Sequence, residues 1–426
     1  MRILLINPPI YDFSAYDYWI KPLGLLYISS ILKENNIEVG LIDAMNRFDE
    51  YFKNVKSDEY GRGKFPFKKM NKPDVLKKIP LYFKRYGLPS EIIKERIIEF
   101  KPDFVFVTTT MTYWYLGAKE ILELVKSIDK KIPVFLGGIY PTLLFEHAIS
   151  LGFDDVFRNN ELKRVGDIIG IKIPNNFKDF PPPDYSFYRI LKYVAITTSL
   201  GCPFRCSYCA SYKITPDFQF KEPEIVYDEI RYFYEKGIRD FVIYDDALLF
   251  PQDRFISLFK KVGDNLKDIR IHTPNGLHAR FIDTEIAEIM KKANFIQPRI
   301  SLETINREKQ LRTGGKIFTD EFEEAVNRLI KTGYKSSDII AYIIFGLPDD
   351  TIDECQKTMD YLHSLKVTIY LSEFSPIPAS DYYDVEDPLL SNNTIYLHYK
   401  NRGKELQFLK DYKNKLNRIL KFQGYQ

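Results

Sequence analysis

Short apolar runs alternate along the first third of the chain with longer segments that carry apolar residues at every third or fourth position. The short runs predict β-strands and the longer segments predict helices, because side chains repeat every second residue in a strand and about every 3.6 residues in a helix. We expect strands at 2–6, 38–42, 104–107 and 134–136, and helices at 23–33, 91–100 and 116–127. Strands that alternate with helices predict an α/β domain with a parallel, doubly wound sheet of the Rossmann or flavodoxin type.

The same alternation resumes after a proline-rich stretch at 175–189. We expect strands at 193–198, 240–244, 270–272, 297–302, 338–345 and 368–374, with helices between them such as 223–236 and 320–331. Six strand–helix units predict a partial (β/α)6 barrel of the TIM type. A basic amphipathic pattern at 401–422 predicts a helical tail that docks on the barrel or binds a partner, and we favour docking.

These patterns suggest four parts: a doubly wound domain at 1–174, a stiffened linker at 175–189, the barrel at 190–380, and a helical extension at 381–426. An insertion at 47–90 interrupts the first domain and mixes aromatic residues with lysines. It is either a lid over the sheet or a solvated insertion packed by its own aromatic residues, and we favour the second interpretation.

Turn residues follow each expected strand of the first domain. They are Asn7, Pro8, Pro9, Asp43, Thr108, Thr109, Thr110, Gly137 and Gly138. In open parallel sheets, ligands bind at the carboxyl ends of the strands. We therefore expect a ligand site at this edge.

Composition excludes several classes of protein. The net charge is +3, and lysine and arginine form no long run, so no nucleic-acid partner is expected. No apolar run approaches the ~20 residues of a membrane span, and the apolar start is too short for a signal peptide. Three of the four cysteines are clustered, which favours a reducing cytoplasm over a disulfide framework.

The clustered cysteines are Cys202, Cys206 and Cys209, in a Cys-x3-Cys-x2-Cys arrangement on an expected loop after the first barrel strand. Soft thiolates are the ligands that iron–sulfur clusters take. A fourth cysteine usually completes such a site, but Cys355 lies far away in a helical pattern. One iron would then be open to a small molecule. The alternatives are buried free thiols or a zinc site, which usually needs four protein ligands.

The cysteine motif resembles that of the radical S-adenosylmethionine (SAM) superfamily, in which an aromatic residue such as Tyr208 precedes the last cysteine. The resemblance implies a [4Fe–4S] cluster whose open iron is chelated by the amino and carboxylate groups of SAM. It also implies an electron donor, a flavodoxin or ferredoxin, and cleavage of SAM to a 5′-deoxyadenosyl radical that abstracts hydrogen from a substrate.

Several other barrel residues match SAM-contacting elements of that family. The resemblance implies that Asp245 and Asp246 lie near the methionyl amine, that Ser301 and Glu303 surround the ribose and carboxylate, and that Gly346 backs the adenine. The two aspartates are alternatively a helix cap. Candidate catalytic groups are His272, whose pKa is ordinarily near neutral, and Glu373, at the end of the last strand. A packed histidine is an equal alternative for His272.

The first domain contains Asn7-Pro8-Pro9, Pro22-Leu23-Gly24-Leu25, Lys101-Pro102-Asp103, Thr110-Met111-Thr112 and Gly137-Gly138-Ile139-Tyr140-Pro141-Thr142. In these motifs it resembles the cobalamin-binding domain that precedes many radical SAM enzymes. The resemblance implies cobalamin contacts from Asn7, Pro8, Gly24, Asp43, Thr110, Gly137 and Gly138. The Asp-x-His-x-x-Gly loop of other cobalamin proteins is absent, and the usual Gly-Glu-rich turn is replaced by a segment at 157–161. A flavodoxin-like domain without a cofactor is the alternative.

Together these resemblances imply a cobalamin-type radical SAM enzyme that transfers a methyl group to an unactivated carbon or to phosphorus of a small-molecule, lipid or peptide substrate. One alternative is a cyclase or other hydrogen-abstracting enzyme without cobalamin. The other is a non-enzymatic iron–sulfur electron carrier or sensor. The absence of a second cysteine cluster argues against peptide-maturation enzymes and methylthiotransferases.

Overall fold

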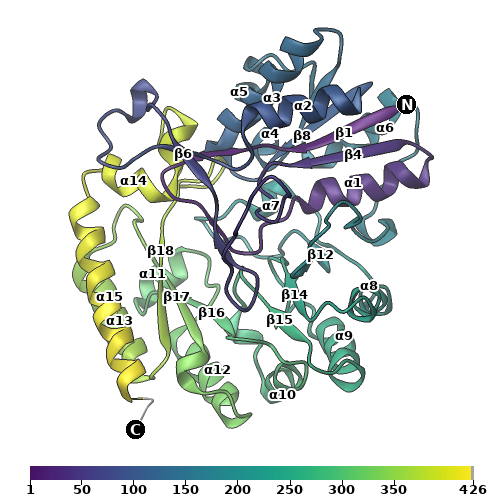
Figure 1. The fold of residues 1–426 in the computed structure, drawn as a ribbon. Coiled ribbons are helices and arrows are strands. Elements are labelled where there is room, and N and C mark those ends of the chain that lie inside the picture. The colour runs from purple at the N-terminus through teal and green to yellow at the C-terminus, as the bar shows by residue number, and fades with distance from the viewer. Residues whose placement is uncertain (424–426) are drawn as a thin grey trace. The chain divides into compact units, whose positions relative to one another are not determined.

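The computed structural model describes residues 1–423 and divides into two units, each with its own strands and helices (Figure 1). The first unit comprises Met1–Ala195, Lys213–Thr215 and Val385–Asn392. The second comprises Ile196–Tyr212, Pro216–Asp384 and the chain from Asn393 onward. The division falls within a strand just before the cysteine loop, so the second unit contains all three clustered cysteines.

Five parallel strands form the sheet of the first unit, in the order β10-β9-β8-β1-β4. They are β1 (Arg2–Asn7), β4 (Glu38–Asp43), β8 (Phe104–Thr109), β9 (Val134–Gly138) and β10 (Asp155–Val156). This is the flavodoxin order, which reverses between β1 and β8 and leaves a crevice for ligands at their carboxyl ends. The predicted doubly wound sheet is confirmed. Strand β10 was not predicted, because two residues are too few to show a period.

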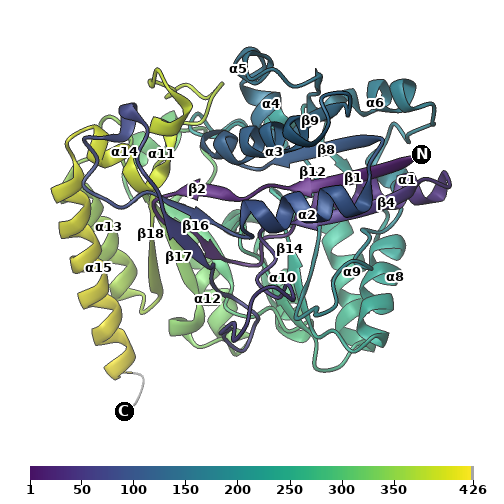
Figure 2. The same cartoon turned by 45° about the horizontal axis from the view of Figure 1, so that its top comes forward.

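Helices cover both faces of this sheet. Alternate β1 residues Ile3 and Leu5 pack in one apolar cluster with α1 (Leu23–Glu34) and α6 (Leu162–Ile169). Helices α2 (Ser90–Phe100) and α3 (Tyr115–Ile128) contact each other on the opposite face (Figure 2). Each apolar side chain buried in this way stabilises the fold by roughly 1.5–3 kcal/mol.

The insertion at 47–90 is an integral part of the first unit. Its strand β7 (Lys84–Tyr86) pairs antiparallel with β6 (Phe67–Lys69) and with β2 (Ile10–Asp12), which follows directly after β1. Three of its aromatic side chains, Phe65, Phe83 and Tyr86, are buried. The favoured interpretation of an aromatic-packed insertion therefore agrees with the structure, but the packing also involves β2. A role as a lid stays a prediction.

The proline-rich segment at 175–189, expected to be a linker, lies within the first unit and packs on α1. Asp184 accepts a hydrogen bond from Ser29 (2.7 Å) and forms an ion pair with Lys33 (2.6 Å). The hydroxyl of Tyr185 donates to the Ala195 carbonyl at 2.6 Å. Phe177, Tyr185 and Tyr188 of this segment are buried, so it folds with the first unit, and its role as a linker stays a prediction.

The barrel strands are β11 (Val194–Ile196), β14 (Asp240–Ile243), β15 (Arg270–His272), β16 (Arg299–Glu303), β17 (Ile340–Phe345) and β18 (Thr368–Glu373). Strand β14 pairs parallel with β15, and β16, β17 and β18 form a second parallel set. Single parallel bridges, Ile271–Phe295 and Leu277–Ile300, join the two sets. The six strands of the predicted partial barrel are therefore present.

Helices of the second unit follow its strands (Figure 1). They are α8 (Pro223–Glu235), α9 (Gln252–Asn265), α10 (Thr284–Lys292), α11 (Arg307–Arg312), α12 (Thr319–Lys331), α13 (Ile352–Ser364), α14 (Asn393–Tyr399) and α15 (Gly403–Gln423). Shorter elements across the chain are β3 (Tyr16–Asp17), β5 (Gly63–Lys64), α4 (Ile139–Leu143), α5 (Phe145–Ser150), β12 (Ser199–Leu200), α7 (Ser211–Ile214) and β13 (Gln219–Phe220). Within residues 1–423, no helix has the length and apolarity to cross a membrane.

The predicted docking of the C-terminal helix is confirmed. Helix α15 packs along α13 and β18. The side-chain amide of Asn417 accepts a hydrogen bond from the Ile369 nitrogen (3.0 Å) and donates one to the Ile369 carbonyl (2.9 Å). Both backbone groups of a residue on the last barrel strand are thus satisfied by the helix.

Candidate cluster and cofactor sites

The three clustered cysteines lie on one loop after β12. Cys206 is buried, and Cys202 and Cys209 are half-buried. The Cys209 nitrogen donates to the Cys206 carbonyl at 3.0 Å, which tightens the loop. The pKa of Cys202 is raised to about 11, chiefly by burial and in smaller part by the neighbouring Asp246, Cys209 and Cys206. Three thiols that repel each other's ionisation need a cationic group to be held as thiolates, which fits an iron–sulfur cluster.

Barrel elements fix the cysteine loop in place. The Ser207 nitrogen donates to the Thr313 carbonyl at 3.3 Å. Gly314 has φ +109°, and a Cβ there would lie 3.1 Å from the Arg205 carbonyl oxygen, so glycine permits this close approach. The Phe204 ring packs edge-on against His278, with centroids 4.6 Å apart. The turn after α11 and an aromatic contact therefore support the loop from two sides.

Asp245 anchors the segment that leads into the cysteine loop. Its carboxylate accepts hydrogen bonds from the Thr198 nitrogen (2.7 Å) and hydroxyl (2.5 Å) and from the hydroxyls of Ser199 (2.6 Å) and Thr197 (3.2 Å). Arg254 lies 3.6 Å away. We expected this carboxylate near the SAM amine, but its oxygens already accept hydrogen bonds from residues 197–199 of the chain. Its contact with SAM stays a prediction, and the arrangement favours a positioning role.

Asp246, next in sequence, is the more exposed of the two aspartates. Displacement of water by the surrounding protein raises its pKa to about 6, and the neighbouring charge of Asp245 adds to this shift. A carboxylate that is costly to ionise gains from a cationic partner. Asp246 is therefore the better placed of the pair to receive an ammonium group.

A register shift on β16 separates two predicted SAM-contacting residues. Ser301 is buried, whereas Glu303 is half-buried, with φ +69°, at an irregularity in the pairing with β17. A bulge changes the direction of the side chain that follows it. Side chains of a regular strand alternate between its two faces, and this alternation does not extend to Glu303. Glu303 lies 3.4 Å from Lys316. Burial is the main cause of the raised pKa of Tyr208, and the charge of Glu303 is the second cause. Because Tyr208 lies on the cysteine loop, Glu303 is close to that loop.

Gly346 begins a tight turn at the carboxyl end of β17. It has φ +126°, and a Cβ there would lie 2.9 Å from the Cβ of Phe374 and 3.1 Å from Leu397. The chain's own packing therefore requires glycine at this position. The predicted approach of adenine to this turn stays a prediction.

His272 is buried, with its Nε2 2.8 Å from an oxygen of Asp240. Arg270 also donates to this carboxylate, at 2.7 Å. This arrangement favours the packed-histidine interpretation. Glu373 lies 2.6 Å from Lys410 of α15, and in the described part of the chain its second oxygen is buried without a hydrogen-bond partner. The catalytic roles considered for His272 and Glu373 stay predictions.

The Asp240 cluster predicts an acid-sensitive contribution to stability. Burial alone would raise the pKa of Asp240, but hydrogen bonds from Arg270 and His272 hold it below its usual value. Because the folded pKa is lowered, the contribution is present above the unfolded pKa of about 4 and is lost as pH falls through the folded value. We expect Asp240→Asn to cost on the order of 2 kcal/mol at pH 7 and less at pH 3. Urea unfolding of both proteins across this range tests this, and a constant difference would contradict it.

A small cavity lies at the carboxyl ends of β1, β4 and β8, where the sequence predicted a ligand site. Its lining includes Asn7, Pro8 and Thr110, and also Lys21, Met45, Thr109 and Trp114. Asp43 lies beside Asn7, and its two oxygens accept hydrogen bonds from Asn7 (2.7 Å) and from the Tyr188 hydroxyl (2.8 Å). Asp43 therefore orients Asn7 rather than lining the cavity.

The predicted glycines of this domain differ in their surroundings. Gly24, at the start of α1, and Gly137, on β9, face open space, so another group could approach their bare backbone. Gly138 has φ +105°, and a Cβ there would lie 2.7 Å from the Thr108 hydroxyl. The pairing of β8 with β9 sets Thr108 opposite Gly137 and Thr109 opposite Gly138.

Sequence reasoning missed Lys21 as a cavity residue. Its ammonium group lies 4.2 Å from the ring centroid of Tyr188 and 5.4 Å from that of Tyr193. Burial lowers the pKa of Lys21, while the carboxylates of Asp43 and Asp17 act in the opposite direction. Its position directly before the Pro22-Leu23-Gly24-Leu25 segment was the available signal.

Two stretches of the chain match models of known protein families. Residues 196–362 match the family model of the radical SAM superfamily. Residues 85–162 match the model of the B12 binding domain. The first match starts within β11 and contains the cysteine loop. The second covers β8 and β9, which carry Thr110 and the two glycines at their ends.

Similar sequences include an uncharacterized methyltransferase of Pyrococcus horikoshii, 23% identical over 86% of this chain and 79% of that protein. An anaerobic magnesium-protoporphyrin IX monomethyl ester cyclase of Rubrivivax gelatinosus is 21% identical over 64% of this chain. This match spans only 56% of the cyclase.

Solved structures share the fold. The radical SAM methyltransferase TsrM from Kitasatospora setae aligns with a TM-score of 0.66 at 16% identity, over 90% of this chain and 75% of that one. The cobalamin-dependent SAM radical enzyme OxsB aligns with a TM-score of 0.60 at 15% identity, over 95% of this chain and 56% of that one. The chain therefore carries a B12-binding domain, matched at 85–162, ahead of a radical SAM domain, matched at 196–362.

Proposed function

We propose that this enzyme transfers a methyl group from SAM to an unactivated carbon or phosphorus atom of its substrate, with cobalamin as the methyl carrier. The observation that carries the proposal is the cavity at the sheet edge of a B12-binding domain, largely apolar but with a few polar groups, in a chain that also has the three-cysteine loop. The methyltransferase among its relatives supports the same reaction.

Cys202, Cys206 and Cys209 are the proposed cluster ligands. When bound, the [4Fe–4S] cluster supplies the electron for reductive SAM cleavage, and an external one-electron donor must replenish it. The chain's own groups hold SAM against this loop. Asp246 would accept hydrogen bonds from the SAM amine, and Lys316, which lies beside Glu303, would pair with the SAM carboxylate. Gly346 closes the turn where the adenine would lie.

The residues at the sheet edge fit part of a cobalamin. As it stands in the structure, this cavity would take only a portion of so large a cofactor. The lining offers the Asn7 amide, two threonine hydroxyls and the Lys21 ammonium, which suit the amides and phosphate of its periphery. The bare backbone at Gly24 and Gly137 leaves room for the remainder.

Anaerobic reconstitution with iron, sulfide and hydroxocobalamin tests the proposal. We expect the cluster and a stoichiometric bound corrinoid in the absorbance spectrum, and S-adenosylhomocysteine as a product of turnover, because SAM that donates its methyl group becomes that compound. A protein that binds no corrinoid but releases 5′-deoxyadenosine would overturn methyl transfer. It would favour a hydrogen-abstracting reaction such as ring closure, consistent with the cyclases among the relatives.

Lys21 provides a sharper test of the cavity. We expect Lys21→Met to weaken corrinoid binding about tenfold or more, because it removes a charged donor of a kind worth roughly 1.5–3 kcal/mol. Absorbance titration of the cluster-free protein measures this without turnover. Lys119→Met is the matched control, since Lys119 lies half exposed on α3. Equal corrinoid affinities of both variants and the wild type would contradict the proposed binding of cobalamin in this cavity.

A further inference from the structure

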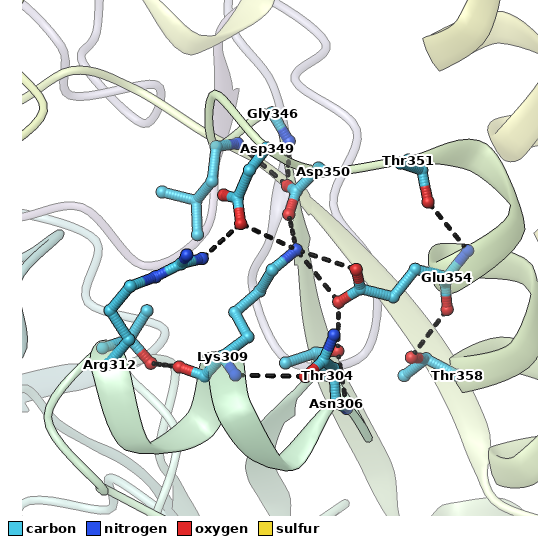
Figure 3. A network of polar contacts seen from close by, with 12 residues as sticks. Thr304, Asn306, Lys309, Arg312, Gly346, Asp349, Asp350, Thr351, Glu354 and Thr358 are labelled. Carbon is cyan, nitrogen blue, oxygen red and sulfur yellow. Dashed lines mark hydrogen bonds and ion pairs between the residues drawn. The ribbon is translucent and has the colours of Figure 1, made fainter.

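Lys309 of α11 is a buried cation at the centre of a polar network in the second unit (Figure 3). Its side chain is only 4% exposed. The ammonium group donates to an oxygen of Asp350 at 2.7 Å and lies 2.9 Å from Glu354. The Thr304 hydroxyl, at the end of β16, also donates to Glu354 at 2.9 Å. Burial lowers the pKa of Lys309, but the two carboxylates more than offset this, so the group stays charged.

The second oxygen of Asp350 holds the turn after β17. It accepts hydrogen bonds from the backbone nitrogens of Gly346 (2.7 Å) and Leu347 (2.9 Å). Figure 3 shows Asp350 between this turn and the Lys309 ammonium. The lysine therefore reaches the Gly346–Leu347 backbone through a single carboxylate.

The other end of α11 supports the cysteine loop. The Thr313 hydroxyl donates to the Lys309 carbonyl at 2.8 Å, and the Thr313 carbonyl accepts the hydrogen bond from Ser207 described above. Gly314, the next residue, lies against Arg205 and Cys206. One short helix thus connects the loop that carries the cysteines with the turn that carries Gly346.

We propose that Lys309 is a positioning residue that sets the separation between the cysteine loop and the Gly346–Leu347 turn, and with it the length of the SAM site. This inference rests on the proposed placement of SAM between these two elements. A ligand held at both ends binds well only if the two ends are correctly spaced. An apolar side chain could fill the space of Lys309 but could not bind the Asp350 oxygen.

Lys309→Met tests the role in two independent measurements. In the cofactor-free chain, we expect faster hydrogen–deuterium exchange in peptides that contain Gly346 and Leu347. In the cluster-loaded protein, we expect SAM affinity at equilibrium to fall about 10- to 100-fold, with unchanged iron content. Lys309→Arg should restore part of the affinity. Asp350→Asn, which weakens the same connection from its other side, should reproduce the loss if Lys309→Met does not fold.

Arg85→Met is the control for a general loss of stability. Arg85 forms a similarly buried ion pair with Glu120 (2.7 Å) in the first unit. It should lower the melting temperature without changing SAM affinity or exchange at Gly346. Unchanged SAM affinity in Lys309→Met, or an equal loss in Arg85→Met, would overturn the positioning role. A wild-type protein with a full cluster that binds no SAM would instead overturn the proposed function.

Discussion

Serine in place of Cys202, Cys206 or Cys209 is expected to abolish reductive SAM cleavage, whereas Cys355→Ser leaves it intact. Serine matches cysteine in shape but offers a hard hydroxyl that is protonated at neutral pH, so each single change removes one cluster ligand. Cys355 is buried in α13, and burial raises its pKa to about 12, so it stays a neutral thiol within the packing of that helix.

Iron and sulfide content after reconstitution, together with 5′-deoxyadenosine release, measures this effect. All four serine variants should retain their helical circular dichroism, because serine is nearly isosteric with cysteine. A serine variant at 202, 206 or 209 with a complete cluster and full turnover would contradict the proposed ligands.

Asp245→Asn is expected to destabilise the second unit and to reduce cluster retention. The substitution leaves buried Arg254 without its charged neighbour. It also replaces one acceptor oxygen by an NH2 group that faces the hydrogen-bond donors of Thr198 and Ser199. Breaking a buried ion pair by removing one partner costs about 3–5 kcal/mol. Because Asp245 holds Thr198 and Ser199, the segment before Cys202 should loosen as well.

Asp246→Asn separates the two aspartates. Because the pKa of Asp246 is raised, its ionised form costs folding energy at neutral pH, so its replacement should not lower the free energy of unfolding while it weakens SAM binding. Denaturant unfolding of the apo-proteins and a SAM titration of the loaded proteins give the comparison. The assignment would be reversed if Asp245→Asn lost only SAM affinity and Asp246→Asn lost stability.

The repeating apolar patterns were sufficient to predict the layout of both units. Each predicted strand has its counterpart, because strands such as β1 and β17 are long enough to show their alternation. Strand β10 is too short for that. The linker role of the proline-rich segment stays a prediction, because its prolines indicate stiffness but do not show that Tyr185 and Phe177 are buried.

The candidate site was only partly predictable for a similar reason. Spacing along the chain identified the three cysteines, but it could not show that Asp245 points into the chain and Asp246 away from it. The bulge at Glu303 depends on pairing with β17 and has no local signature. Lys309 and Asp350 are 41 residues apart in sequence, so their contact exists only in the folded barrel.

The bidentate contact between Asn417 and Ile369 has a consequence for the solution behaviour of the enzyme. An incomplete barrel ends in a strand whose backbone could recruit a strand from another molecule, the usual starting point of aggregation. Helix α15 occupies that side with a surface rich in lysine, which repels a second copy of itself. Helix α15 therefore protects the exposed edge of the last barrel strand.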